Sequence, residues 1–217
     1  MFNNVTIIVD EITGNLIKPI SKFANVTMFT SSKGINSDVV ASAEELNNLL
    51  VDESENYIFV ASSIGAFIGW THVHNYPNKL KGLILLDPAH PDQGTSLLAI
   101  LNKHELPNSQ GLENLKKFCL STNEASETGK KQFNSIKTLY DLQLLILIAG
   151  SISFANAVPN EIDELISKDR HKMLIKCSKL STNGKFIIIP DVGHGIASEA
   201  PDLVSEIIQK FIQEIYV

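Results

Sequence analysis

Short runs of apolar residues recur along the chain, and most of them are continuously apolar rather than alternating with polar positions. Six runs are rich in β-branched residues, and they lie at 5–9, 25–30, 57–61, 82–87, 144–150 and 185–190. Runs of this length and composition are typical of parallel strands that helices cover on both faces. The pattern therefore predicts a doubly wound, mainly parallel six-stranded sheet.

Helical patterns, with apolar residues three to four positions apart, fill the intervals between these runs. The expected helices cover residues 15–23, 38–51, 64–76, 160–180 and 199–215. In the last of them, Leu203, Ile207 and Phe211 lie on one stripe of the helix surface. Alternating strands and helices predict an α/β protein with right-handed crossover connections.

One connection departs from this alternation. About fifty residues between Pro88 and Asp141 contain no strand-like run, and helical segments are expected there at 95–103, 111–120 and 127–140. Ligands of open α/β sheets bind at the carboxyl ends of the strands. We therefore expect residues 88–141 to form a helical cap inserted into a core of residues 1–87 and 142–217. A helical excursion packed on the side of the core is the alternative.

Composition and charge exclude several classes of protein. The chain has 217 residues, of which 44% are apolar and 19% charged, as expected for one folded domain. The net charge is −6, and no concentrated run of Lys and Arg indicates nucleic-acid binding. Neither a leader nor an apolar stretch near the roughly 20 residues of a membrane span is seen. We therefore expect a cytoplasmic protein with a small-molecule substrate and no nucleic-acid or membrane partner, its oligomeric state being unknown.

The segment YIFVASSIGAFIGW carries the strongest chemical signal. A strand ends at Ala61, a small-x-Ser-x-Gly turn follows at 61–65, and a helix begins at once. Such a nucleophile elbow strains the serine and lifts its hydroxyl clear of the backbone beside amides that can hold an oxyanion. We therefore expect Ser63 to be a nucleophile and the amide of Ile64 to be an oxyanion donor. A serine that simply caps the helix is the alternative.

His194 is the candidate general base for that serine. It follows the last strand on a short loop flanked by glycines, and the final helix comes after it. A loop that leaves the carboxyl end of a parallel strand lies at the same sheet edge as the elbow, which is where a base for Ser63 must be. Taken alone, a loop histidine is more often a solvated side chain.

Together these segments resemble the α/β-hydrolase superfamily. The run YPNKLKGLILLDPAHPDQG at 76–94 is similar to a run that follows the elbow in one group of its serine hydrolases, and STNGKFIIIPDVGHGIASEAPDLV resembles the family's last strand, histidine loop and helix. The resemblance extends, with decreasing strength, over nearly the whole chain from Val5. It implies an α/β-hydrolase fold lacking the first antiparallel strands, a catalytic triad, an acyl-enzyme intermediate and no cofactor.

The triad that the resemblance implies also needs an acid. The commonest family position follows the strand at 144–150, but the sequence there has no acid before Glu161 and Asp163. Asp87 ends the preceding strand, where some branches of the family, including certain haloalkane dehalogenases and lipases, carry their acid. We therefore assign Asp87 as the partner of His194, with a structural role in capping the following turn as the alternative.

The loop after the first strand departs from the family pattern. The family has a His-Gly or Gly-rich loop there that donates a second oxyanion amide, whereas this chain reads VDEITGN. By position that amide belongs to Ile12, and Asp10 and Glu11 stand where small neutral residues are expected. A carboxylate facing the hole would oppose the oxyanion, and losing one donor costs roughly 10²–10³ in rate. The alternative is that both side chains point to the surface. We expect Glu11, Ser62 and His90 to border the substrate pocket.

These residues predict a serine hydrolase that cleaves an ester, thioester or lactone of a small organic substrate. The alternative is a hydrolytically impaired protein of this fold that acts as a non-hydrolytic cyclase or lyase, or binds a ligand. Asp10, Glu11 and the missing acid after Gly150 favour that alternative. No phosphate-binding glycine-rich loop appears, and His72 and His74 face different directions on a helix, so neither a nucleotide nor a metal is expected.

Overall fold

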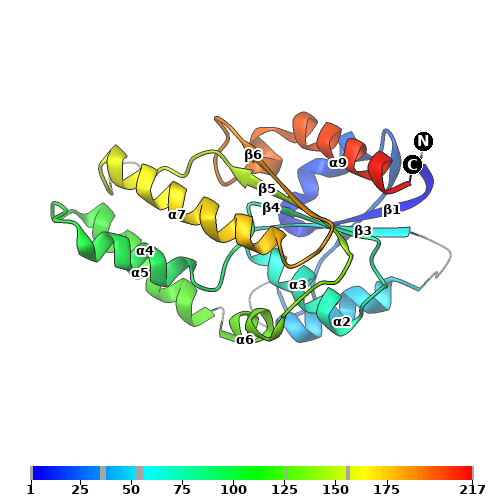
Figure 1. The fold of residues 1–217 in the computed structure, drawn as a ribbon, viewed down its shortest axis with the longest axis horizontal. Helices are drawn as coiled ribbons and strands as arrows, with labels where there is room; N and C mark the ends of the chain where they lie inside the picture. Colours follow the sequence, from blue (N-terminus) through cyan, green and yellow to red (C-terminus); the bar gives the residue numbers. More distant parts are fainter. Residues whose placement is uncertain (1, 35–37, 52–55, 126, 155–156, 217) are drawn as a thin grey trace.

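A six-stranded parallel sheet forms the centre of the computed structural model, which describes residues 2–34, 38–51, 56–125, 127–154 and 157–216 (Figure 1). The strand order is β2-β1-β3-β4-β5-β6, and every pair of neighbours is parallel. The strands are β1 (Phe2–Asp10), β2 (Ala24–Phe29), β3 (Asn56–Ser62), β4 (Gly82–Leu86), β5 (Gln143–Ala149) and β6 (Gly184–Ile189). The continuous apolar runs thus predicted the fold class and the place of each strand correctly.

Helices cover both faces of this sheet, as the buried strands require. Helices α1 (Ile17–Ile20) and α9 (Pro201–Tyr216) pack on one face, and α2 (Val39–Leu49), α3 (Ala66–Asn75) and α7 (Asn160–Ser178) pack on the other (Figure 1). Short helices η1 (Glu11–Leu16), η2 (Ser63–Gly65) and α8 (Ile196–Glu199) follow the ends of β1, β3 and β6. Across the described part of the chain, every helix is too short or too polar to cross a bilayer.

The insertion between β4 and β5 forms three helices that pack in two different places. Helices α4 (Gln93–Lys103) and α5 (Gln110–Ala125) extend away from the sheet beside the first half of α7 (Figure 1). They share with α7 a separate apolar cluster of Leu97, Leu101, Leu112, Leu115, Cys119, Ile162 and Ile166. Helix α6 (Glu127–Ser135) instead packs on α3. The division into a core and a cap at 88–141 stays a prediction.

The last helix of the insertion ends earlier than its sequence pattern predicts. Helix α6 stops at Ser135, and the expected helix ran on to residue 140. Ile136 and Leu139 are buried in the loop that follows, and the Leu139 amide donates to the Leu180 carbonyl oxygen at 2.7 Å. Tyr140 has a φ of 54°, a left-handed value that does not continue a helix. Tertiary contacts of the apolar residues therefore replace the last turn of the expected helix.

Candidate active site

The turn between β3 and α3 holds Ser63 in a strained conformation. Its φ of 51° lies in the left-handed region, which costs a residue other than glycine of order 1 kcal/mol or more. Ala61 and Ala66 on either side are completely buried, so strand and helix approach closely. The Ser63 carbonyl oxygen accepts a 2.8 Å hydrogen bond from the Ala89 amide, which holds the turn from the neighbouring strand end. This is the backbone expected of a nucleophile elbow.

Three side chains from the ends of three strands form one hydrogen-bonded chain. His194 Nε2 lies 3.0 Å from Ser63 Oγ, and His194 Nδ1 lies 2.6 Å from Asp87 Oδ2. Asp87 is completely buried, whereas the histidine side chain is half exposed. In this arrangement the imidazole can take the serine proton while the carboxylate orients the ring and stabilises its charged form.

The acids at the commonest family position lie in other environments. The Asp163 carboxylate accepts hydrogen bonds from the Ser153 hydroxyl at 3.1 Å and from the Phe154 amide at 3.0 Å. It thereby fixes the loop that follows β5. Glu161 is exposed in the first turn of α7. Asp87 is accordingly the carboxylate that the described structure places within hydrogen-bond reach of His194.

Asp87 has a second set of partners on the side away from the histidine. Its Oδ1 accepts a 3.1 Å hydrogen bond from the Ala149 amide and forms an ion pair with Arg170 Nη1. Arg170 Nη2 donates to the carbonyl oxygens of Asp87 at 3.0 Å and Pro88 at 3.2 Å. The guanidinium is buried, and burial lowers the pKa of Arg170 while the adjacent Asp87 carboxylate raises it. No local sequence pattern distinguishes Arg170 from the other charged residues of α7.

Asp10 lies beneath the elbow, in neither of the two places expected for it. Its buried carboxylate accepts hydrogen bonds from the Thr13 amide and from the Ser62 amide, each at 2.9 Å. Burial raises the pKa of Asp10 to about 6, and the amides of Ser62, Thr13 and Ile12 oppose that shift. The carboxylate thus bonds to an amide of the loop that carries Ile12, the expected second oxyanion donor, and to an amide of the elbow. Glu11 is exposed.

An apolar cavity of about 110 Å³ opens over Ser63 and His194. Its lining combines the two site residues with side chains of α3, of α5 and of the segment after β4. These residues are Ser63, Ile64, Phe67, Ala89, His90, Pro91, Gln93, Gly94, Leu97, Phe118, Cys119 and His194. His90 thus borders the cavity, and burial is the main cause that lowers its pKa.

Two residues expected at the pocket lie outside the lining of this cavity. The Ser62 side chain is buried. Ser62 pairs with Leu86 of the neighbouring strand β4, and its hydroxyl donates to the Leu86 carbonyl oxygen at 3.0 Å. Glu11 projects from the start of η1 and is exposed. Within the described residues, His90 is therefore the member of the expected trio that contacts the cavity.

Solved structures of hydrolytic enzymes share this architecture. A thermophilic esterase from Thermogutta terrifontis has a TM-score of 0.58 and 14% identity, covering 98% of this chain and 90% of the esterase. An epoxide hydrolase from Bacillus megaterium has a TM-score of 0.59 and 11% identity, covering 97% and 93%. The chain has the α/β-hydrolase fold. No protein-family model matches the sequence, and no curated protein sequence matches it either.

A glutamate positions the histidine loop of this α/β-hydrolase fold. The Glu199 carboxylate accepts hydrogen bonds from the amides of Gly193 at 2.8 Å and Gly195 at 3.2 Å, one on each side of His194. A Cβ atom at Gly193 would lie 3.0 Å from Glu199 Oε1, so a larger residue there would push this carboxylate aside. The glycines that flank His194 are visible in the sequence, whereas the role of Glu199, the last residue of α8, emerges only from the fold.

The two histidines of α3 lie away from this chemistry. His72 is completely buried, its ring centroid lies 5.3 Å from that of Tyr76, and burial lowers its pKa to about 4. His74 Nε2 lies 3.5 Å from Ser135 Oγ. Among the described residues, no group of three His, Cys, Asp or Glu side chains is placed to hold a metal ion.

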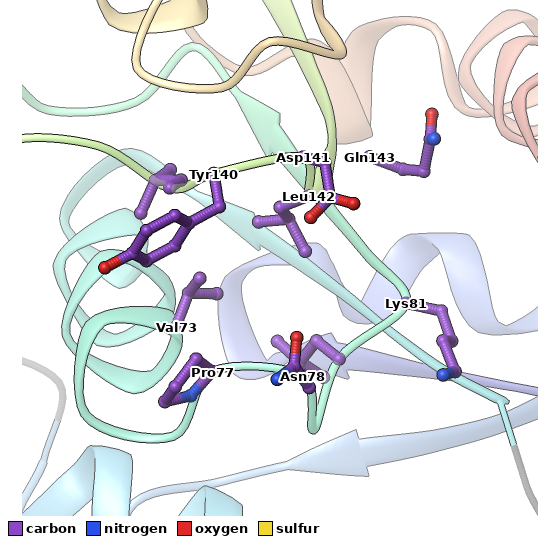
Figure 2. A pocket seen from close by; sticks show the side chains of 10 residues that line it. Val73, Pro77, Asn78, Lys81, Tyr140, Asp141, Leu142 and Gln143 are labelled. Atoms are coloured by element: carbon purple, nitrogen blue, oxygen red, sulfur yellow. The ribbon is translucent and has the colours of Figure 1, made fainter.

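A larger cavity of about 200 Å³ lies at the opposite edge of the sheet, where β4 and β5 begin (Figure 2). Figure 2 shows Tyr140, Asp141 and Leu142 on one side of it, and Pro77, Asn78 and Lys81 on the other. The residues that line it include no serine, threonine, cysteine or histidine. The smaller cavity, which contacts both Ser63 and His194, is therefore the candidate substrate site.

Proposed function

We propose that the protein is a serine hydrolase that cleaves an ester, thioester or lactone of a small organic substrate through an acyl-enzyme. The observation that carries this proposal is the hydrogen-bonded chain Ser63–His194–Asp87, whose nucleophile opens into an apolar cavity. The α/β-hydrolase fold of an esterase and other hydrolytic enzymes agrees with this proposal without specifying the substrate.

Each half of the proposed reaction needs two proton transfers through the same imidazole. Ser63 Oγ attacks the carbonyl carbon while His194 Nε2 takes its proton, and the carbonyl oxygen becomes an oxyanion held by the Ile64 amide. His194 then returns the proton to the leaving alkoxide or thiolate, which departs and leaves the acyl-enzyme. Water repeats the cycle, releasing the carboxylic acid and restoring the serine. Asp87 stabilises the imidazolium in both halves of the reaction.

The cavity volume favours substrates with a small apolar acyl group. Pockets for drug-sized ligands measure about 300–1,000 Å³, whereas this one has about 110 Å³. Apolar side chains such as Phe67 and Leu97 line it, and burial of methylene groups against them is favourable. We therefore expect short acyl chains to be preferred over long ones.

The oxyanion loop favours a second candidate function, a hydrolytically impaired protein that binds or rearranges a small ligand. The Asp10 carboxylate lies at the start of the loop expected to supply the second oxyanion donor, Ile12, where it accepts hydrogen bonds from the amides of Thr13 and Ser62. A negative charge at this place opposes an oxyanion nearby, and one missing donor costs roughly 10²–10³ in rate. The complete triad favours hydrolysis, so we propose a slow hydrolase as the principal function.

Hydrolysis of p-nitrophenyl acetate, butyrate and octanoate by the wild type and by Ser63→Ala tests this function. We expect the wild type to turn over the two short esters, with a kcat/KM for butyrate at least about tenfold above that for octanoate because the longer chain exceeds the cavity. Ser63→Ala should lose the activity, whereas Ser62→Ala, at a buried neighbour, should keep it. Wild-type activity that persists in Ser63→Ala would contradict the proposal. Covalent labelling of Ser63 without turnover of any ester would favour the impaired alternative.

A further inference from the structure

The Arg170 guanidinium contacts both the acid of the site and the backbone that carries that acid. Nη1 pairs with Asp87 Oδ1, and Nη2 donates to the carbonyl oxygens of Asp87 and Pro88. The other carboxylate oxygen, Oδ2, is the one that lies 2.6 Å from His194 Nδ1. Arg170 comes from the middle of α7, which contributes no member of the Ser63–His194–Asp87 chain. The two partners thus divide the carboxylate between them, one oxygen each.

Asp87 is in a position that needs such a partner. Its side chain is completely buried, and an ionised carboxylate in an apolar interior becomes neutral unless charges or donors compensate it. Its φ of 46° is a left-handed value, which persists only where neighbouring groups hold the backbone. Arg170 supplies a compensating charge to the side chain and two hydrogen bonds to the backbone of residues 87 and 88.

The same backbone segment reaches the nucleophile. The Ala89 amide, next in the chain after Pro88, donates to the Ser63 carbonyl oxygen at 2.8 Å. A guanidinium that fixes residues 87 and 88 therefore also fixes the strand end that supports the elbow. The fork of Arg170 connects α7 with the acid directly and with the nucleophile through one further hydrogen bond.

We propose that Arg170 is the positioning residue of this site, and that its guanidinium directs Asp87 Oδ2 at His194 by holding Oδ1 and the backbone of residues 87 and 88. This role rests on the proposed function of Ser63, His194 and Asp87. A purely structural ion pair between α7 and the end of β4 is the competing account, since buried salt bridges occur without any catalytic role. The two accounts differ in what they predict for the pH dependence of the reaction.

Loss of the guanidinium should move the acidic limb of the pH profile to higher pH. An unopposed Asp87 carboxylate favours the charged imidazole more strongly, and a buried carboxylate without its cation also takes up a proton more readily. Each effect raises the pH at which acidification removes the active form. For a charge in direct contact with the carboxylate, we expect the acidic limb to shift by about one pH unit or more. The other titratable groups nearby are His90, Asp169, His171 and Glu199, and Asp10 lies under the elbow; all five stay unchanged in the variants.

Two substitutions at Arg170 separate the charge of the guanidinium from its shape. Arg170→Met removes both, and we expect kcat per active site to fall about 100-fold, as for a misplaced catalytic group, with the acidic limb shifted upward. Arg170→Lys keeps a cation but cannot bind the carboxylate and two carbonyl oxygens together. It should therefore retain the wild-type acidic limb and recover only part of kcat. Asp163→Asn is the matched control, because it neutralises another buried carboxylate of α7, one that bonds to Ser153 and Phe154. It should leave the acidic limb of the pH profile unchanged.

The experiment measures p-nitrophenyl butyrate hydrolysis between about pH 5 and pH 9, with active sites counted by a fluorophosphonate probe. Counting sites separates loss of folded protein from loss of catalysis. An Arg170→Met variant with wild-type kcat per labelled site and an unshifted limb would overturn the positioning role. If Arg170→Met does not fold, full kcat in Arg170→Lys would overturn it equally. A wild type that neither labels nor hydrolyses would instead overturn the proposed function.

Discussion

Replacement of Asp10 by Asn tests the buried carboxylate beneath the elbow, because its effect on stability should depend on pH. The folded pKa of about 6 lies above the ordinary value of 3.8, so between these values the native protein holds a proton that the unfolded chain has released. The protonated side chain therefore favours the native state at low pH, and this contribution is lost as the pH rises through 6. The full difference is about 3 kcal/mol, at about 1.4 kcal/mol for each pH unit.

The measurable part of this difference lies between about pH 4.5 and pH 7.5. Over that window the linkage relation lowers the free energy of unfolding of the wild type by about 2 kcal/mol. This is less than the full difference because part of the change already occurs below pH 4.5. Asn does not titrate, so the free energy of unfolding of Asp10→Asn relative to wild type should rise by about 2 kcal/mol from the lower to the higher pH. At every pH, the free energy of unfolding of Asp10→Asn should also be lower by a constant amount of about 1–3 kcal/mol. The reason is that the Asn side chain can accept from only one of the Thr13 and Ser62 amides.

Urea unfolding at several pH values provides the assay, with midpoints converted through the measured slopes. Asp38→Asn is the matched control, because Asp38 also accepts two amide hydrogen bonds, at the start of α2, but is exposed. Asn caps a helix about as well as Asp, so this control should differ little from wild type at either pH. An Asp10→Asn offset that is equal at both ends of the window would refute a buried, titrating Asp10.

Three further variants test single contacts of the site. Asp87→Asn should lower kcat of ester hydrolysis about 10⁴-fold. It should also lower the free energy of unfolding in urea by about 3–5 kcal/mol, because Arg170 is left without its counter-charge. Unchanged stability would contradict the buried ion pair. Glu199→Gln, whose side chain can accept only one of the two loop amides, should slow fluorophosphonate labelling about tenfold by loosening His194, and an unaltered rate would show that the loop holds itself. Glu11→Gln should leave kcat/KM within about twofold, because its carboxylate is exposed; a large increase would place that carboxylate at the oxyanion.

The sheet, and the edge of it at which the candidate site residues meet, could be predicted from the sequence because each depends on local patterns. Continuous apolar runs identify parallel strands, and a strand followed by small-x-Ser-x-Gly and a helix requires a tight turn. Carboxyl ends of parallel strands share one edge, so a strand-end serine, aspartate and histidine are expected to meet there. Asp87, Ser63 and His194 lie in hydrogen-bond contact at that edge.

The partners of these residues depend on tertiary contacts that no local pattern encodes. Arg170 is one charged residue among several in α7, and only the packing of that helix on β5 brings it to Asp87. The burial of Asp10 depends on the Ser62 amide, 52 positions away in the chain. A nearer signal existed for Asp10, since an aspartate three residues before Thr13 is the pattern of a helix cap, and it does accept from the Thr13 amide.

Covalent labelling is the direct test of whether Ser63 is an activated nucleophile, on which the proposed function depends. The protein is treated with a fluorophosphonate, and the modified peptide is identified by mass spectrometry in the wild type, Ser63→Ala and Ser62→Ala. We expect a single adduct on Ser63 that forms in the wild type and in Ser62→Ala and is absent from Ser63→Ala. An adduct on Ser62, labelling that survives in Ser63→Ala, or no adduct at all in the folded wild type would contradict it.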